Sequence, residues 1–406
     1  MKAKKFRCCG GLVMFIGLFT FVTLMGMPAI TAAESADPMA KWALSKPWYP
    51  LNILGWYGKY DVKTLHKDLV DLPAKSLEGP KDVAWTGPVK ATKKYHLGFA
   101  FPHLMDPYWV SVLYGIIDEA RLCGVDISAL TAGGYGNISR QTSQVETLVN
   151  KGIDGLIMSG VSYGALTPTL EEAVKKGVKV LLLINDADTP DPIAKAMTSY
   201  YNLGVESANI VINHSKARRE KGEEIKVAFF PGPGGLSWST SSFLGFKGRI
   251  KEANLQNQIK IVAEKWGLSE KAVQLKLLEP VLTTFPDLDY VVGNTVFADA
   301  AAGAVERAGR AGKTHVVSTY MAQPVYRGIK AGQILGAPQE FQQIVGRLAV
   351  DQMVRTLNGE TPGVDFPFHV MPKIVIMNKE NIDSYPWEYQ FEPKGWKPVF
   401  SYKVPN

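Results

Sequence analysis

The chain has 406 residues, of which 46% are hydrophobic and 20% charged, a composition that supplies a sizeable core and excludes wholesale disorder. Its formal net charge of +7 includes four basic residues within positions 1–33, which hold no acidic residue, so the remainder carries +3. That modest charge removes the main argument for a nucleic-acid partner, and we expect none. A chain of this length predicts two domains or one large one.

Residues 1–33 have the three parts of a secretory signal peptide. Positions 2–7 carry four positive charges, an apolar run follows from Gly11 to Thr31, and small residues precede Glu34. We therefore predict a periplasmic protein whose signal peptide is cleaved near Ala33. An uncleaved membrane anchor is the alternative, because the apolar run is about long enough to span a bilayer.

Residues 34–92 are rich in aromatic and turn-forming residues and show little periodicity. We predict a segment that wraps around the body of the protein, with a surface for a partner as the alternative. The tail at 378–406 contains Trp387, Tyr389, Trp396 and Phe400 and is predicted to dock in the same way.

Between these two segments, short apolar runs alternate with helical patterns, beginning with a predicted strand at Leu97–Phe101. Such runs are typical of parallel strands that helices cover on both faces. The predicted fold class is therefore α/β, with two lobes of similar size.

Aromatic residues stand where the first two predicted strands of this region end. Tyr108 and Trp109 follow the first strand, and Tyr135 follows the second. Because ligands of open parallel sheets bind outside the carboxyl ends of the strands, these residues are candidates for a binding site. The alternative is that they are core aromatics.

Signatures of catalysis are missing from the sequence. The six histidines make no zinc-ligand spacing, there is no Gly-x-Ser-x-Gly motif, and the loop Pro231–Gly235 lacks the Lys-Ser/Thr of a phosphate loop. Asp186 and Asp188 form a possible acid pair, but no histidine or metal cluster accompanies them. We expect no catalytic residue, no metal and no cofactor, and hence no enzyme.

From about residue 93 to 377 the sequence resembles the type I periplasmic binding proteins, the ribose-binding-like group. The resemblance rests on Asp106-Pro107-Tyr108-Trp109, on Ala132-Gly133-Gly134-Tyr135 and on the loop at 185–188. It implies two Rossmann-like lobes that are joined by a hinge of three crossovers and close on a ligand by hinge motion. On this basis the first lobe takes residues 93–200 plus 338–362, and the second takes 202–337 plus 365–377. The crossovers are predicted near 200–202, 337–339 and 362–367. Sugar-binding members hold hydroxyls with an Asp-Arg pair where Asn185 and Asp186 stand here, so the residues that recognise sugars are largely replaced.

A closer resemblance is to the members of this family that bind trimethylamine N-oxide and work with a membrane sensor histidine kinase. It adds Pro231-Gly232-Pro233 and Val325-Tyr326-Arg327-Gly328 to the matching segments. It implies an aromatic box around the trimethyl group. The residues at matching positions are Asp106, Tyr108, Trp109, Tyr135, Tyr200 and Tyr320, with Tyr201, Asn185, Asp186 and Trp238 as further candidates. The relatives carry a tryptophan where Tyr200 or Tyr201 stands, which leaves the identity of the ligand open.

Aromatic faces suit a methylated cation or a zwitterion with cationic nitrogen, through cation–π attraction of about 0.5–2 kcal/mol per ring. Asp106 either supplies a negative charge beside that nitrogen or caps the helix that follows it. We expect a small methylated amine or amine oxide as ligand and a membrane sensor histidine kinase as partner. The alternative is a receptor that delivers a sugar or another small solute to an ABC importer.

Overall fold

The computed structural model describes residues 37–405, with gaps at 45–47, 49–50, 67–70 and 190. The predicted signal peptide and its cleavage site lie outside the described residues. Residues 37–406 form one compact unit. Across the part of the chain that the structure describes, no helix combines the length and apolar character needed to cross a bilayer.

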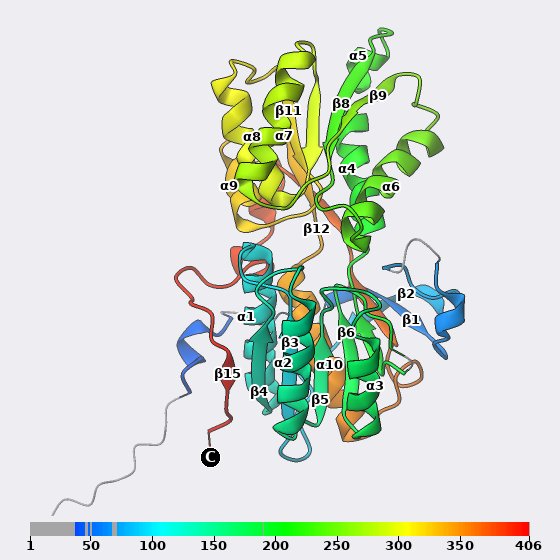
Figure 1. The fold of residues 1–406 in the computed structure, drawn as a ribbon, viewed down its shortest axis with the longest axis vertical. Coiled ribbons are helices and arrows are strands. Elements are labelled where there is room, and N and C mark those ends of the chain that lie inside the picture. Colours follow the sequence, from blue (N-terminus) through cyan, green and yellow to red (C-terminus); the bar gives the residue numbers. More distant parts are fainter. Residues whose placement is uncertain (1–36, 45–47, 49–50, 67–70, 190, 406) are drawn as a thin grey trace, which may run out of the picture. The chain divides into compact units, whose positions relative to one another are not determined.

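Two sheets of mainly parallel strands confirm the predicted two-lobe α/β fold (Figure 1). In the described residues the first sheet has the strand order β15-β4-β3-β5-β6-β7-β13-β1-β2, and it is parallel from β4 to β13. Its strands are β1 (Leu51–Tyr57), β2 (Glu78–Trp85), β3 (His96–Phe101), β4 (Asp126–Thr131), β5 (Gly155–Met158), β6 (Lys179–Leu183), β7 (Ala194–Ala196), β13 (His369–Pro372) and β15 (Ser401–Tyr402).

The second sheet has the order β14-β12-β11-β10-β8-β9, in which β14 alone is antiparallel to its neighbour. Its strands are β8 (Ile225–Phe230), β9 (Ile259–Glu264), β10 (Tyr290–Gly293), β11 (His315–Ser318), β12 (Gly336–Gln339) and β14 (Val375–Asn378). Central strands such as β10 are buried along their whole length, as expected for a parallel sheet covered on both faces.

Helices flank both sheets and divide between the lobes (Figure 1). With the first sheet lie α1 (Pro107–Cys123), α2 (Ile138–Asn150), α3 (Thr167–Lys175) and α10 (Gln342–Asn358). With the second lie α4 (Tyr200–His214), α5 (Lys216–Arg219), α6 (Ser237–Glu252), α7 (Lys271–Thr284), α8 (Thr295–Arg307) and α9 (Gln323–Lys330), while the short α11 (Trp387–Gln390) belongs to the tail. Helices α1 and α10 approach so closely that a Cβ on Gly115 would come within 2.1 Å of the Gln343 carbonyl oxygen, so only glycine fits there.

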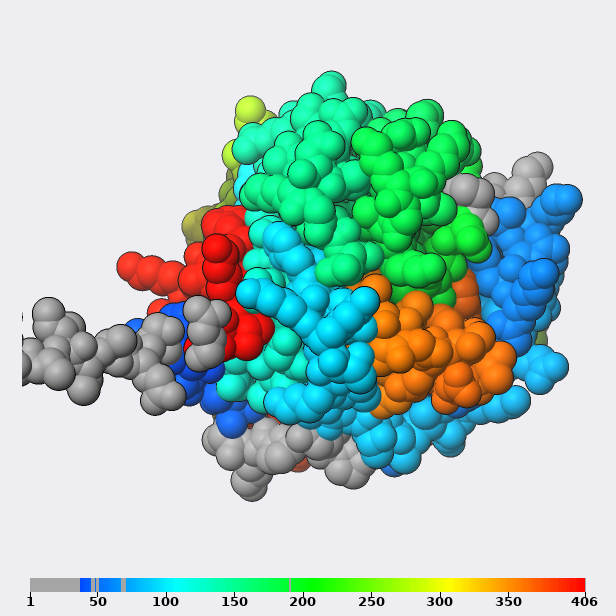
Figure 2. Space-filling view, turned by 90° about the horizontal axis from the view of Figure 1, so that it is seen from below, coloured from blue at the N-terminus to red at the C-terminus, as the bar shows by residue number. Residues whose placement is uncertain are grey.

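The segments before and after the two lobes extend the first sheet at opposite edges. Strands β1 and β2 pair as an antiparallel hairpin beside β13, and β15 of the tail pairs with β4. Figure 2 shows the hairpin on one flank of this lobe and the red tail on the other. The hairpin differs from the irregular segment that the weak periodicity of residues 34–92 predicts.

One lobe boundary was predicted wrongly. Strand β13 lies in the first sheet, paired with β7 on one side and β1 on the other, so residues 369–372 belong to the first lobe. Only β14 joins the second sheet, by pairing with β12. The third crossover therefore lies between 372 and 375 instead of 362–367. Strands β13 and β14 are adjacent in sequence but belong to different sheets, because each pairs with strands that lie far away in the chain.

Candidate ligand-binding site

Helix α1 places three of the candidate residues at the end of β3. Asp106 is its N-cap, with extended backbone, and its Oδ1 accepts a hydrogen bond from the Tyr108 backbone N–H at 2.9 Å. Pro107 suits the first helical position because its missing N–H needs no partner there. The N-cap interpretation of Asp106 is thus confirmed, and the cap fixes Tyr108 and Trp109 in the first turn of the helix.

A cavity of about 440 Å³ lies at this helix start and is lined by residues of both lobes. Six aromatic side chains surround it, and they come from the ends of different strands and from helix starts: Tyr108, Trp109, Tyr135, Tyr200, Trp238 and Tyr320. Ring centroids of neighbouring members lie between 5.5 and 6.4 Å apart, mostly edge to face or tilted. We call this set the aromatic box.

The second carboxylate oxygen of Asp106 joins the two lobes. Oδ2 accepts hydrogen bonds at 3.2 Å from the Thr295 hydroxyl, at the start of α8, and from the Tyr320 hydroxyl, just after β11. Asp106 therefore serves as helix cap in one lobe and as acceptor for the other. Burial raises the pKa of its carboxyl, against which the three hydrogen bonds act. A cation in the cavity would favour the charged form.

A second buried acid lies behind the box, and sequence reasoning missed it. Glu340 is fully buried in the crossover between β12 and α10, close to the Tyr108 hydroxyl. Burial raises the pKa of its carboxyl to about 8. Neither of its carboxyl oxygens accepts a well-formed hydrogen bond from a described residue. The available signal was a single acid in the stretch 336–346, which is otherwise uncharged.

Two further groups complete the chemistry of the cavity. His103 lines it, packs edge-on against Tyr135 at 5.2 Å, and has its pKa lowered to about 4 by burial, so it is neutral at physiological pH. The indole N–H of Trp238 is buried and finds no acceptor among the described residues. The described lining of the cavity thus offers π-faces, the free Trp238 N–H, the buried acid Asp106 and the exposed acid Glu270, and no positive charge. Glu340 lies behind Tyr108 and is not part of this lining.

Three of the remaining candidates, Tyr201, Asn185 and Asp186, do not line this cavity. Tyr201 follows Tyr200 in α4 but does not line the cavity, and its backbone N–H donates to Asp71 at 3.1 Å. Asp186 forms a buried ion pair with Lys195 at 2.8 Å. Asn185 contacts the box from outside, by donating to the Tyr135 hydroxyl at 3.1 Å. Trp238 stands 6.1 Å from Tyr200, so an indole still faces this part of the cavity although position 200 is a tyrosine.

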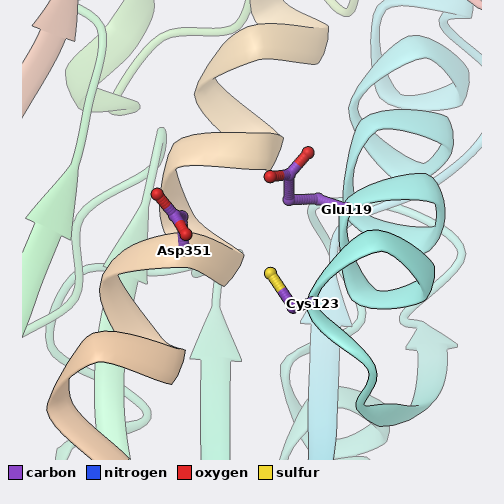
Figure 3. A group of neighbouring side chains, drawn as sticks. All are labelled: Glu119, Cys123 and Asp351. Carbon is purple, nitrogen blue, oxygen red and sulfur yellow. The ribbon is translucent and has the colours of Figure 1, made fainter. Parts of the chain in front are cut away.

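A separate buried cluster joins α1 to α10 (Figure 3). Ligand-type atoms of Glu119, Cys123 and Asp351 lie within 4.8 Å of one another. The two carboxylates of this cluster accept hydrogen bonds from the N-terminal segment. Glu119 accepts from the Trp48 indole at 2.8 Å, and Asp351 accepts from the Trp85 indole at 2.7 Å. Burial raises the pKa of the Cys123 thiol. These contacts assign the cluster to holding the N-terminal segment against the first lobe.

The fold and the inter-lobe cavity define a binding protein, and the comparisons agree: the chain belongs to the periplasmic binding proteins, because the family model described as a periplasmic binding protein domain matches residues 97–361. Among curated relatives, periplasmic protein TorT of Escherichia coli strain K12 is 29% identical over 318 residues, covering 78% of this chain and 87% of TorT. The D-allose-binding periplasmic protein of the same strain is 26% identical over 284 residues, covering 68% and 88%.

Two solved structures are informative. An ABC transporter solute-binding protein from Bradyrhizobium sp. BTAi1 with bound bis-tris has a TM-score of 0.73 and 34% identity, covering 88% of this chain and all of that one. TorT in complex with the TorS sensor domain, in the absence of ligand, has a TM-score of 0.66 and 26% identity, covering 75% and 99%. The chain is thus a TorT-like member of the type I periplasmic binding superfamily.

Proposed function

We propose that this protein is a periplasmic sensor that binds a small methylated amine or amine oxide, such as trimethylamine N-oxide, and signals to a membrane histidine kinase. The observation that carries the proposal is the aromatic box itself. Six rings surround a cavity of about 440 Å³, large enough for a compact solute, and its described lining contains no Asn, Gln or Arg to hold the hydroxyls of a sugar. Each ring that faces a methylated cation contributes about 0.5–2 kcal/mol.

The polar groups match the two ends of an amine oxide. The buried acids Asp106 and Glu340 lie on the side of Tyr108, where they favour a cationic nitrogen. The free Trp238 N–H can donate to the oxide oxygen. The function needs no catalytic group, metal or cofactor, and we propose binding without enzymatic activity.

Lobe closure provides the signal in this proposal. Asp106 accepts hydrogen bonds from Thr295 and Tyr320 of the second lobe only when the lobes meet. A ligand shifts the equilibrium between open and closed forms by its differential affinity for them. A kinase that contacts both lobes would read that shift. The relative TorT, solved with the TorS sensor domain, supports a kinase as partner.

Calorimetry with trimethylamine N-oxide, glycine betaine, choline and ribose tests the ligand class. Binding of one or more of the methylated compounds, with no binding of ribose, is the expected result. Binding of ribose alone would refute the aromatic-box argument. Binding of the isolated sensor domain of a kinase encoded nearby, measured with and without the bound solute, tests the partner.

A second candidate function is delivery of a solute to an ABC importer. The observation in its favour is the 34% identity to the Bradyrhizobium solute-binding protein, over 88% of this chain. The two functions share the fold and differ in partner. Genes for a permease and an ATPase beside this one, together with solute uptake that is lost on deletion, would favour the importer.

A further inference from the structure

A second cavity, of about 460 Å³, adjoins the aromatic box and shares two of its walls, Tyr135 and Trp238. The centroids of these two rings lie 6.3 Å apart with the planes tilted by 37°, so they do not stack in face contact. Tyr135 is half-buried, and its hydroxyl accepts a hydrogen bond from Asn185, which lines the second cavity. Tyr135 and Trp238 therefore divide the inter-lobe cleft into two compartments.

The second compartment holds a buried acceptor without a donor. Asn185 is 7% exposed, and its Nδ2 donates to the Tyr135 hydroxyl at 3.1 Å and to the Gly160 carbonyl at 3.3 Å. Because a carbonyl can only accept, the second bond fixes the orientation of the amide. Its Oδ1 then accepts no hydrogen bond from any described residue. A buried acceptor left in this way is costly, and a donor from a ligand would satisfy it.

The backbone before Asn185 is strained. Ile184 has a φ of 61°, in the left-handed region that β-branched residues rarely adopt. Such strain persists only where the surrounding structure holds it, and it is common at ligand sites. The neighbouring acid is not available to a ligand, because Asp186 is paired with the buried Lys195. Recognition on this wall thus falls to Asn185.

The opposite wall of the compartment is the start of α6. Leu236 is the N-cap of that helix and has no side-chain oxygen, so no side chain caps the first N–H groups. Ser237 and Thr240 of the first turn line the cavity. Uncapped N–H groups and the positive end of the helix dipole favour an oxygen atom of a ligand. A hydroxyl is the simplest group that can both donate to Asn185 and accept from α6.

We propose that the second compartment binds a hydroxyl-bearing arm of the ligand whose methylated ammonium head occupies the aromatic box. This inference rests on the proposed function and narrows its ligand class to hydroxyalkyl trimethylammonium compounds. The head lies among the rings, the arm passes between Tyr135 and Trp238, and the hydroxyl donates to Asn185 Oδ1.

Three ligands separate the contributions, measured by calorimetry on the mature chain. Tetramethylammonium has the head alone, choline adds the hydroxyl arm, and propyltrimethylammonium has an arm of the same length that ends in a methyl group. Choline should bind about tenfold more tightly than propyltrimethylammonium, as expected for one hydrogen bond to a buried acceptor. The Asn185→Leu variant should remove that preference, so that choline and propyltrimethylammonium bind to it with equal affinity.

A conservative variant provides the control. Asn185→Asp keeps an acceptor oxygen and should retain the preference for choline, and thermal unfolding shows that both variants fold. Equal affinities of choline and propyltrimethylammonium in the wild type, with tetramethylammonium bound, would overturn this inference while the proposed function stands. Failure of all methylated compounds, trimethylamine N-oxide included, to bind would instead refute the proposed function.

Discussion

Replacing Asp106 with Asn tests the role of this residue between the lobes. Asn is as good an N-cap as Asp, so Oδ1 keeps its bond to the Tyr108 N–H and α1 is unchanged. The other end of the side chain becomes a neutral NH₂ donor, so the bonds that Thr295 and Tyr320 donate to a carboxylate are replaced by weaker ones in which their hydroxyls accept. At about 1 kcal/mol for each, the closed form loses about 2 kcal/mol, or roughly 30-fold in affinity for a ligand that requires closure.

The assay is calorimetry with trimethylamine N-oxide on wild type and Asp106→Asn, together with urea unfolding of both. Asp106→Ala is the matched control, because it also removes the cap and should lower the free energy of unfolding by about a further 1 kcal/mol. The double variant Thr295→Val, Tyr320→Phe removes the same bonds from the other lobe and should weaken binding similarly. An affinity of Asp106→Asn within twofold of wild type would refute the reasoning.

Three further variants test other parts of the site and its support. Trp238→Phe keeps a ring but removes the free indole N–H, so affinity for trimethylamine N-oxide should fall about fivefold while tetramethylammonium is little affected, as calorimetry would show. Burial raises the pKa of Glu340 from 4.5 to about 8, so its contribution to the free energy of unfolding is complete below pH 4.5 and is lost as the pH rises through 8. Glu340→Gln should remove that decline from Tm values measured across this pH range. The same pH profile in the variant as in wild type would contradict the raised pKa of Glu340. Arg347→Met leaves the buried Glu119 without its cation and Asp118 with Arg121 alone, and it should cost about 3–5 kcal/mol in urea unfolding; a loss below 1 kcal/mol would show that the pairs are dispensable.

Local pattern was sufficient for the parts of the fold that repeat. Short buried apolar runs such as β5 are too short for helices, so they were predicted as strands. The residues that follow such parallel strands lie at one edge of the sheet. This is why Tyr108 and Tyr135 were predicted beside a binding site from the first unit alone. Trp238 was ambiguous between cleft and solvent, because its position at a helix start does not specify which way the side chain points.

The failures share a cause, which is pairing between distant segments. Strand β1 forms because it pairs with β13, which lies more than 300 residues later in the sequence. The local periodicity around β1 does not indicate that pairing. The same contact draws β13 into the first sheet, against the predicted boundary. Glu340 was missed because Tyr108, its neighbour in space, lies more than 200 residues away in sequence. A single acid in an apolar crossover matches no sequence motif that would indicate a binding site.

Glu340 also connects the chemistry of the box to the hinge. It lies between β12 of the second lobe and α10 of the first, and the next residue, Phe341, has a left-handed backbone with a φ of 57°. A cation in the box attracts a carboxylate and therefore lowers the pKa of Glu340 from its raised value of about 8. Affinity for a permanent cation such as choline should then rise as the pH approaches 8. Below pH 8, binding of the cation should release a proton from Glu340. Calorimetry in buffers of different ionisation enthalpy measures that proton. Its absence, or the same proton release in Glu340→Gln, would show that the acid in the hinge does not respond to the charge of the ligand.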